Sequence, residues 1–468
     1  MSDIKFGTDG WRAIIGQEFT VNNVARVSHA TGLWLKDNFD NPSIVIGHDC
    51  RFAGELFAET AAKVLVANNV KVYLAKGAVS TPMISLANVK LDASAGIVIT
   101  ASHNPPSYNG FKLKGSYGGP LFPENVKEVE TLIPEKNAID LNKDSIEELV
   151  GKGKIEMVDL ETMYYDQVVS NFDIEKIKNS GIGLGYDAMF GAGQDIAKRL
   201  LPGISFLHCD YNPSFMGVPP EPILKNLKEF SAFIAEDPKI TCGLATDGDA
   251  DRLGMFNESG DFIDSHHLIL LLIHYLCKYK GMKGKVCTAF STTVKIKKMC
   301  QHYNLPLEVV QIGFKHICEI MVNEDVLVGG EESGGIALKG HIPERDGIWV
   351  GLTIWEFMAN SGKTLNELID EVYEITGRFA FERSDLHLKE EQKQAIIKRC
   401  IDGGYNSFGD YKVERMDDMD GYKYFFNENE WFMIRPSGTE PVLRTYAESE
   451  SKEGALAIIK AGYDTLMN

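Results

Sequence analysis

The stretch Ser43-Ile44-Val45-Ile46-Gly47-His48-Asp49 is a short β-branched run that ends in a polar turn and is followed by a helical pattern. Two other stretches open in the same way, Ile182 to Ala188 and Lys285 to Ser291. This alternation is typical of α/β units whose strands are largely parallel. Because the copies begin more than a hundred residues apart, they indicate repeated domains, whereas solenoid repeats would recur every 20–50 residues or so.

The size of the chain and its polar stretches predict four domains. A length of 468 residues exceeds what one hydrophobic core usually serves. The expected boundaries are a stretch rich in Glu, Lys, Asn and Asp at 133–154, the end of an acidic turn near Gly260, and the end of a helical pattern near Gly377. The fold class is α/β, with three related α/β domains and a smaller C-terminal α+β domain that has helices on one face of its sheet. The expected domains are residues 1–155, 156–259, 260–376 and 377–468.

The composition excludes several classes of function. With 44% hydrophobic and 24% charged residues, the chain is typical of a globular protein. Its formal net charge of -18 opposes binding to nucleic acid or to an anionic membrane, because both carry the same sign. The longest apolar run, Leu268 to Cys277, is too short to span a bilayer, and no apolar signal segment follows Met1. Without a signal segment or a membrane span, we expect a cytoplasmic protein, and we expect a monomer or homodimer. Eight scattered cysteines indicate reduced, mostly buried thiols.

A first candidate segment is Ile97 to Pro106, where an apolar strand enters a loop that two prolines and an asparagine keep from becoming helical. Ser102 therefore stands at the C-terminal edge of a strand, where ligands of open α/β sheets bind. A serine there can act as a nucleophile or phosphoryl carrier if a cation offsets the transferred charge, and His103 and Lys112 are close in sequence. The alternative is a serine that only satisfies the hydrogen bonds of a turn.

A second segment, Cys242 to Gly254, places Asp247, Asp249 and Asp251 at alternating positions after an apolar strand. In a compact loop the three carboxylates can converge on one ion, and such hard oxygen ligands suit Mg²⁺ or Ca²⁺. An EF-hand does not fit, because its sixth position requires Gly where this chain has Arg252, and because the flanks are strand-like. A solvated acidic loop remains the alternative.

A third segment, Val328 to Gly335, is glycine-rich and carries Glu331 and Ser333. A carboxylate in such a loop can accept hydrogen bonds from two neighbouring sugar hydroxyls. The glycines let the backbone approach a ligand, although a plain turn is equally compatible with this segment alone. Lys315 upstream and Arg345 downstream contribute cations.

Two further segments carry arginines. Trp431 to Pro441 runs from an apolar strand into a Ser/Gly/Thr loop, with Arg435 at its entrance and Arg444 beyond it. Hydroxyls, backbone N–H groups and guanidinium donors together suit a phosphate, and an ordinary turn is the alternative. Phe6 to Arg12 contains two glycines and an arginine, and by itself indicates only a capped turn that leads into a strand.

Taken in order, these segments resemble those of the α-D-phosphohexomutase superfamily over essentially the whole chain. Thr100-Ala101-Ser102-His103-Asn104-Pro105 looks like the phosphoserine loop of that family, and Asp247 to Arg252 looks like its metal loop. Gly330 to Gly334 is similar to its sugar-specificity loop, and Arg435 to Thr439 is similar to its phosphate-binding loop. The resemblance implies four domains around a central cleft, a phosphorylated resting serine, one Mg²⁺ per chain, and a bisphosphorylated hexose as intermediate and activator.

The resemblance also implies roles for individual residues. Catalytic roles are expected for Ser102, His103, Lys112, Arg12 and Arg252. The expected metal ligands are Ser102, Asp247, Asp249 and Asp251. Contacts with the hexose phosphate are expected from Lys315, Glu331, Ser333, Arg345, Arg435, Ser437, Gly438, Thr439 and Arg444.

The preferred sugar is predicted from departures within these loops. The glucosamine-phosphate branch usually has Glu-Gln-Ser-Gly-His where this chain has Glu331-Glu332-Ser333-Gly334-Gly335, and Ile-Arg-Gly where it has Trp11-Arg12-Ala13. Both departures favour a mutase that interconverts glucose 1-phosphate and glucose 6-phosphate and also acts on mannose phosphates. The stretch Arg435 to Pro441 is common in the glucosamine branch, so a phosphoglucosamine mutase is the alternative.

Two other classes of function compete with a mutase. A serine-dependent sugar phosphatase would share the phosphoserine and the metal, but it would release inorganic phosphate, whereas a mutase must retain its bisphosphate. A non-catalytic sugar-phosphate sensor would not need Ser102 together with three metal carboxylates. The group that accepts the proton of the serine stays open at this stage.

Overall fold

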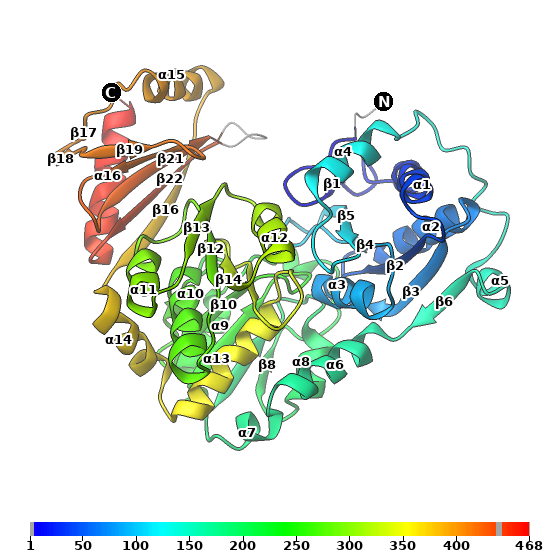
Figure 1. The fold of residues 1–468 in the computed structure, drawn as a ribbon, viewed down its shortest axis with the longest axis horizontal. Helices are drawn as coiled ribbons and strands as arrows, with labels where there is room; N and C mark the ends of the chain where they lie inside the picture. Colours follow the sequence, from blue (N-terminus) through cyan, green and yellow to red (C-terminus); the bar gives the residue numbers. More distant parts are fainter. Residues whose placement is uncertain (1–3, 437–441, 468) are drawn as a thin grey trace.

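The computed structural model describes residues 4–436 and 442–467. Four domains, each built on one main sheet, follow one another along the chain (Figure 1). The first three sheets share one connectivity. Each contains three neighbouring parallel strands, and the next strand in the sequence pairs antiparallel with the third of them. The prediction of three related α/β domains and a different C-terminal domain is therefore confirmed.

The first domain contains a six-stranded sheet. Its strands are β1 (Trp11–Ile14), β2 (Ser43–His48), β3 (Lys71–Ala78), β4 (Ala95–Ile99), β5 (Tyr108–Gly115) and β6 (Ile155–Val158), in the order β1-β5-β4-β2-β3-β6. Its helices are α1 (Val21–Asn38), α2 (Gly54–Ala67), α3 (Thr81–Lys90), α4 (Pro123–Thr131) and α5 (Ile146–Gly151). Because β6 pairs with β3, this sheet ends at Val158, beyond the boundary expected at residue 155. The polar stretch at 133–154 is thus a connection within the first domain that leads to the last strand of its sheet.

Both faces of the first sheet are covered. Ile44 and Ile46 of β2 pack in one apolar cluster with residues of α1 and α2, whereas Val45 packs in another cluster with residues of α3. Successive side chains of a strand point to opposite faces, so this strand must be apolar throughout. That requirement explains the uninterrupted β-branched run in the sequence.

The second domain has a five-stranded sheet. Its strands are β7 (Leu184–Asp187), β8 (Ser205–Leu207), β9 (Cys242–Thr246), β10 (Leu253–Asn257) and β11 (Phe262–Ile263), in the order β11-β10-β9-β7-β8. Its helices are α6 (Leu160–Asn171), α7 (Ile174–Lys178), α8 (Gln194–Leu200), the 3₁₀ turn η1 (Phe215–Gly217) and α9 (Lys228–Glu236). β11 extends this sheet to Ile263, beyond the boundary expected at residue 259.

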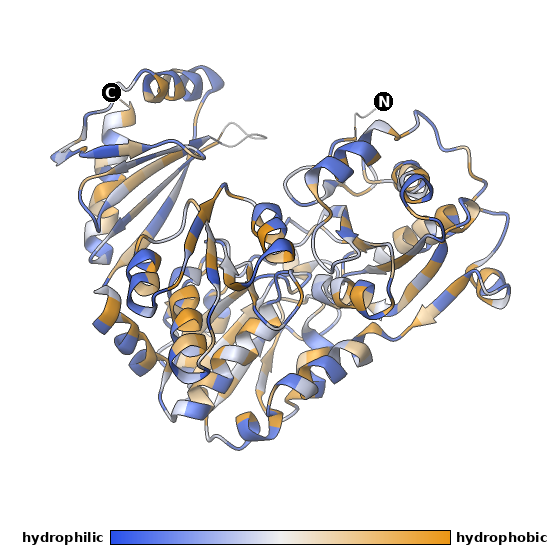
Figure 2. Ribbon diagram, in the orientation of Figure 1, coloured by the Kyte–Doolittle hydropathy of each residue, from blue (hydrophilic) through white to orange (hydrophobic). Residues whose placement is uncertain are grey.

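The third domain has a four-stranded sheet. Its strands are β12 (Lys285–Ala289), β13 (Leu307–Val310), β14 (Val326–Gly330) and β15 (Ile336–Leu338), in the order β13-β12-β14-β15. Its helices are α10 (Ser265–His274), the π-helical segment η2 (Tyr275–Tyr279), α11 (Lys295–Tyr303), α12 (Phe314–Asn323), α13 (Gly347–Ser361) and α14 (Leu365–Thr376). α10 and α13 are almost entirely buried, and Figure 2 shows α10 mostly in the hydrophobic colour. No helix in the described part of the chain combines the length and hydrophobicity needed to cross a membrane.

Three topologically equivalent strands, β4, β9 and β14, lead into the three candidate loops. Each is the last of the three parallel strands, and each loop connects it to the antiparallel partner β5, β10 or β15. Ligands bind at the carboxyl ends of strands in open α/β sheets. The repeated topology therefore places the Ser102 loop, the aspartate loop and the glycine-rich loop at the same position of three related sheets.

The fourth domain is built on an antiparallel sheet. Its strands are β16 (Ala380–His387), β19 (Arg415–Asp417), β20 (Tyr422–Phe425), β21 (Trp431–Pro436) and β22 (Val442–Ser449), in the order β16-β22-β21-β20-β19, with the small pair β17 (Ser407–Phe408) and β18 (Tyr411–Lys412). α15 (Glu390–Ile401) and α16 (Lys452–Met467) share an apolar cluster with Phe432 and Ile434, whereas Trp431 and Met433 pack on Phe290 of the third domain. Helices thus cover one face of this sheet and the third domain contacts the other.

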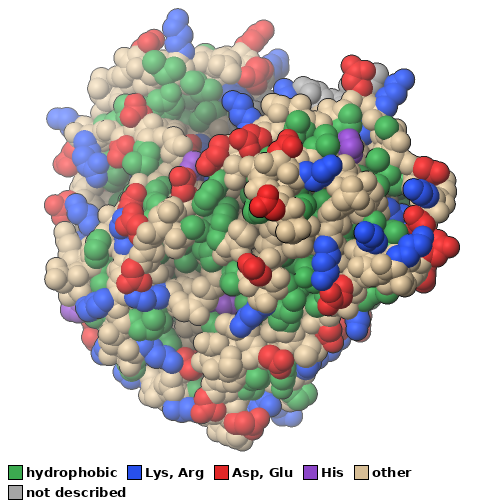
Figure 3. All heavy atoms as spheres, turned by 45° about the vertical axis from the view of Figure 1, so that its right-hand side comes forward, with side chains coloured by type: hydrophobic (Ala, Val, Ile, Leu, Met, Phe, Trp, Pro, Cys, Tyr) green, Lys and Arg blue, Asp and Glu red, His purple; other side chains and the backbone are tan. Residues whose placement is uncertain are grey.

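The surface and the cysteines agree with the composition. Acidic and basic side chains are interspersed on the face shown in Figure 3, and no basic patch stands out there. All eight cysteines are buried and free, as predicted.

Candidate active site

The Ser102 loop follows β4 and meets the aspartate loop of the second domain. The Ser102 hydroxyl donates a hydrogen bond to Asp247 Oδ2 at 2.6 Å and lies 3.3 Å from His103 Nδ1. Ser102 has a positive φ of 51°, a left-handed conformation that is uncommon for residues other than glycine. The aspartate loop comes so close that a Cβ on Gly248 would lie 2.6 Å from the Ser102 carbonyl oxygen. Glycine is therefore required at position 248 by close packing of two backbones.

Three carboxylates form a buried cluster beside Ser102. One oxygen each of Asp247, Asp249 and Asp251 lies within 4.8 Å of the others, and all three residues are fully buried. Burial raises the pKa of Asp247 well above its usual value, and repulsion from the other two carboxylates adds to this effect. Among residues 4–436 and 442–467, the Oδ1 atoms of Asp249 and Asp251 have no hydrogen-bond partner. Buried acceptors without a donor and mutually repelling carboxylates fit a hard divalent cation such as Mg²⁺.

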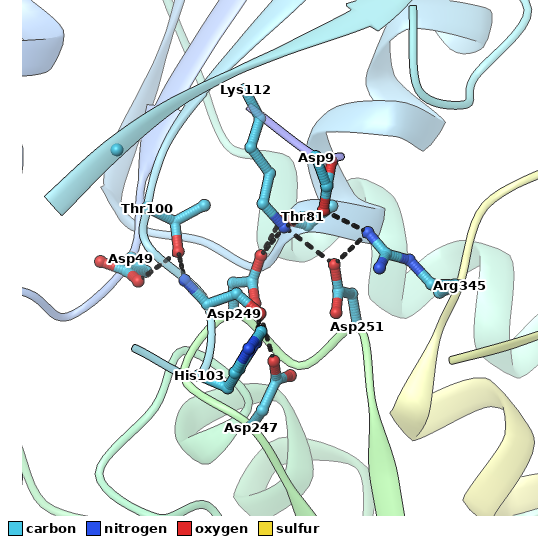
Figure 4. Close-up of polar contacts among 12 residues, drawn as sticks. Asp9, Asp49, Thr81, Thr100, His103, Lys112, Asp247, Asp249, Asp251 and Arg345 are labelled. Atoms are coloured by element: carbon cyan, nitrogen blue, oxygen red, sulfur yellow. Dashed lines mark hydrogen bonds and ion pairs between the residues drawn. The ribbon is translucent and has the colours of Figure 1, made fainter. Parts of the chain in front are cut away.

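Lys112 on β5 reaches into this cluster from the first domain. Its Nζ lies 2.8 Å from Asp249, 2.9 Å from Asp251 and 2.8 Å from Asp9 (Figure 4). Burial alone would lower the pKa of Lys112, but the attraction of these carboxylates outweighs it and raises the pKa. The side chain is thus held as a cation.

The surroundings of His103 disfavour a positive charge, whereas those of Lys112 favour one. Burial lowers the pKa of His103 well below its usual value, and the positive charges of Arg252 and Arg12 lower it further. The imidazole is therefore neutral at physiological pH, and a neutral imidazole can accept a proton.

Each of the first three domains contributes an arginine near the cluster. Arg345 Nη2 contacts Asp251 at 2.7 Å and Asp9 at 2.5 Å, which joins the third domain to the first and second. Arg12 donates to Asn104 Oδ1 at 2.7 Å. The Arg252 backbone N–H donates to Asp247 Oδ1 at 3.1 Å, and its side chain is partly exposed. These cations provide the local positive charge that a phosphate needs on a chain of net negative charge.

The glycine-rich loop presents a carboxylate and a hydroxyl. Glu331 is buried and accepts a hydrogen bond from Gly313 N at 2.8 Å. Burial raises the pKa of Glu331 to about 7, although nearby Arg345 opposes this. Ser333 Oγ is buried and has no hydrogen-bond partner in the described part of the chain. Lys315 lies in the first turn of α12, two residues after Gly313.

The arginines of the fourth domain are placed apart from this cluster. Arg435 pairs with Asp420 at 3.0 Å, and Asp420 in turn accepts from Ile312 N of the third domain at 2.8 Å. Arg444 lies opposite Arg435 in the β21–β22 pair. Within residues 4–436 and 442–467, no hydrogen bond or ion pair connects either arginine to the Ser102 loop or the aspartate cluster. The other predicted residues of this segment, Ser437, Gly438 and Thr439, lie outside the described residues.

Family models match in series along the chain. The models for domains I, II and III of phosphoglucomutase/phosphomannomutase, each described as alpha/beta/alpha, match residues 3–140, 162–260 and 264–375, and the model for the C-terminal domain matches residues 388–461. The chain belongs to the phosphoglucomutase/phosphomannomutase family. The resemblance to the α-D-phosphohexomutase superfamily is thereby confirmed. The superfamily is Mg²⁺-dependent, and this chain carries an aspartate cluster that fits such an ion. The chain is a phosphohexomutase, an enzyme that transfers a phosphoryl group within a sugar phosphate.

Individual relatives carry different substrate names. A Thermococcus kodakarensis phosphoglucomutase/phosphomannomutase is 29% identical, with 98% of each chain covered. A phosphoglucosamine/phosphogalactosamine mutase from Sulfurisphaera tokodaii is also 29% identical, with 96% of each chain covered. The crystal structure of a candidate phosphomannomutase from Thermus thermophilus superposes with a TM-score of 0.88 at 31% identity over the whole of both chains.

The structure of this phosphohexomutase adds polar residues that sequence reasoning missed. Asp9 bridges Lys112 and Arg345. Asp49 and Arg51 lie beneath the Ser102 loop, and Glu344 forms a buried 2.6 Å ion pair with Lys114 between the third and first domains. Asp9 stands between two glycines, and Asp49 follows a strand directly, so a wider search of strand ends could have found both. Nothing in the local sequence marks Glu344.

Proposed function

We propose that this phosphohexomutase interconverts glucose 1-phosphate and glucose 6-phosphate, and also acts on mannose phosphates, with Ser102 as the phosphoryl carrier. The observation that carries this proposal is the hydrogen bond between Ser102 Oγ and Asp247 inside a buried cluster of carboxylates and Lys112. A nucleophilic oxygen beside a cation site and a fixed ammonium is an arrangement suited to phosphoryl transfer.

The aspartates Asp247, Asp249 and Asp251 would hold one Mg²⁺ with the Ser102 phosphate. The ion supplies charge stabilisation for the transferring phosphoryl group when it is bound. Lys112 and Arg345 contribute fixed positive charge on the other side of the carboxylates. A preorganised positive environment lowers the cost of charge that develops on the phosphoryl oxygens.

The reaction consists of two phosphoryl transfers. Phosphorylated Ser102 gives its phosphoryl group to the free hydroxyl of a hexose monophosphate, which forms a bisphosphate and restores the serine hydroxyl. After the bisphosphate turns over, Ser102 takes the other phosphoryl group, and the opposite monophosphate leaves. His103 is suited to accept the proton of the Ser102 hydroxyl when Ser102 takes a phosphoryl group, and to return it when Ser102 gives the group away. Its imidazole is neutral and lies 3.3 Å from Ser102 Oγ, whereas Lys112 is held protonated.

Specificity for glucose and mannose phosphates rests on the glycine-rich loop. Glu331 offers a carboxylate to the sugar hydroxyls, and Ser333 offers a hydroxyl that has no hydrogen-bond partner among the described residues. Arg435, Arg444, Ser437, Gly438 and Thr439 would bind the distal phosphate, with Arg12, Arg252 and Lys315 as further cations. The relatives named for glucosamine phosphate support phosphoglucosamine mutase as the second candidate. The eight buried free cysteines support a reducing, cytoplasmic compartment.

The test compares glucose, mannose and glucosamine 1-phosphates as substrates of the purified protein with Mg²⁺, with Ser102→Ala as the control. We expect 6-phosphate formation fastest from glucose 1-phosphate and almost none with Ser102→Ala. Preference for glucosamine 1-phosphate would favour the second candidate. Release of inorganic phosphate at the rate of turnover would instead identify a phosphatase.

A further inference from the structure

The backbone of Ser102 is held in a strained conformation. Its φ of 51° falls in the left-handed region, which is unfavourable for a residue other than glycine. Such a conformation persists only where surrounding contacts determine it. The peptide groups on both sides of Ser102 are in fact held by polar side chains of the first domain.

The peptide group after Ser102 is held by Arg51, which lies in the turn between β2 and α2. Nη2 of Arg51 donates to the carbonyl oxygens of Ser102 at 2.6 Å and Asn104 at 2.7 Å. Nη1 donates to those of Pro105 and Tyr108, both at 2.9 Å. One rigid guanidinium therefore gathers four carbonyl groups of the loop, which a lysine ammonium with three donors cannot do.

The peptide group before Ser102 is held by a relay of two residues. Ser102 N donates to Thr100 Oγ1 at 2.8 Å, and Thr100 Oγ1 donates to Asp49 Oδ2 at 2.5 Å. Asp49 also faces Arg51 Nε at 3.3 Å and accepts from the Arg51 backbone N–H at 2.9 Å. Asp49 thus connects Thr100, which holds the peptide group before Ser102, with Arg51, which holds the one after it. Figure 4 shows the contact between Asp49 and Thr100.

These three residues do not face the reacting atoms. Asp49, Arg51 and Thr100 are buried, with exposed fractions of 0%, 1% and 0%. Phe215 of the second domain lies over the guanidinium, 5.1 Å from its carbon to the ring centre. Their hydrogen bonds end on the loop backbone or on one another, so their contacts reach the reaction through the placement of Ser102. The charge of Arg51 also acts on His103 and Asp249, and the Arg51→Lys variant would keep that charge.

We infer that Asp49, Arg51 and Thr100 form a backbone clamp that keeps Ser102 left-handed and thereby aims its Oγ at the Asp247 cluster. They are positioning residues, and the inference rests on the proposed role of Ser102. If the clamp is loosened, Oγ moves while the metal carboxylates and the sugar loop stay in place. The chemical step should then slow without a loss of substrate binding, since misplacement by about 1 Å can cost about 100-fold in rate.

The test uses paired variants of the full-length protein. Thr100→Val keeps the shape and removes the hydroxyl, and Thr100→Ser keeps the hydroxyl; Arg51→Lys keeps the charge and loses the fork. Arg26→Lys is the matched control, because Arg26 is also buried in the first domain and donates to a loop carbonyl, Pro134 O at 2.6 Å, away from Ser102. For each variant, kcat, KM, the Mg²⁺ activation constant and Tm are measured, together with Ser102→Ala.

We expect Thr100→Val and Arg51→Lys to lower kcat by about 10- to 100-fold with KM and Mg²⁺ activation within about threefold of the parent, the pattern of a defect in the transition state. Thr100→Ser should recover most of the kcat, and Arg26→Lys should match the parent. The inference fails if Thr100→Val keeps the parental kcat, or if Thr100→Ser is as slow as Thr100→Val. With Ser102→Ala inactive, either result leaves the carrier role intact, whereas an active Ser102→Ala overturns both the carrier role and the clamp.

Discussion

Substituting Gly248 by alanine tests whether the two loops must approach as closely as the structure shows. The added Cβ would lie 2.6 Å from the Ser102 carbonyl oxygen and 3.1 Å from Pro220 Cγ. The carbonyl cannot turn away easily, because Arg51 holds it at 2.6 Å. Restoring an ordinary contact of 3.4 Å requires the loops to separate by about 0.8 Å. The Ser102–Asp247 hydrogen bond, now 2.6 Å, would lengthen beyond the usual range for two oxygens.

A displacement of this size predicts that Gly248→Ala lowers kcat by about 100-fold, or about 2.7 kcal/mol in activation free energy. Steady-state kinetics of 6-phosphate formation with saturating Mg²⁺ measure the effect, and Tm reports any loss of stability. Gly203→Ala is the control, because Gly203 lies in the same domain and its added Cβ would meet nothing within 4 Å. A parental kcat in Gly248→Ala would refute the claim that Ser102 must sit against the aspartate loop.

Three further predictions concern the metal, the distal phosphate and acid stability. Excess chelator should abolish turnover and added Mg²⁺ should restore it; full activity in chelator would rule out the metal role of the aspartates. Arg435→Ala should raise KM for both the 1-phosphate and the 6-phosphate with a smaller loss of kcat, and an unchanged KM for one of them would show that the distal site is not shared. Hydrogen bonds from Lys278, Lys363 and His274 lower the pKa of Glu371 against the effect of burial, so its stabilisation should be complete above pH 4.5 and lost as the pH falls. Tm should therefore differ most between the parent and Glu371→Gln above pH 4.5, and a constant difference down to pH 3 or so would contradict this.

The sequence predicted those parts of the site that depend on a strand and the loop directly after it. Ser102, Asp247 and Glu331 each follow an apolar strand within a few residues, so the strand pattern alone placed them at sheet edges. The three related strand openings likewise predicted the repeated α/β domains. Local sequence carries this information because strand, loop and side chain are neighbours in the chain.

Contacts made through backbone atoms or between domains could not be predicted in this way. Arg51 binds carbonyl groups more than fifty residues away, and every residue type carries a carbonyl, so no sequence pattern marks its partners. Asp9 and Arg345 meet only because the first and third domains pack together. Where Arg435 lies relative to Ser102 depends on the placement of the whole fourth domain.

The carrier role of Ser102 is tested most directly by following the phosphoryl group itself. The purified parent and Ser102→Ala are incubated with glucose 1,6-bisphosphate and Mg²⁺, and intact-protein mass and peptide mapping locate any covalent phosphate. The account predicts one phosphoryl group on the parent, on Ser102, which is transferred to added glucose 1-phosphate with formation of the bisphosphate, and none on Ser102→Ala. A phosphoryl group on another residue, or a parent that turns over substrate without ever carrying phosphate, would contradict it.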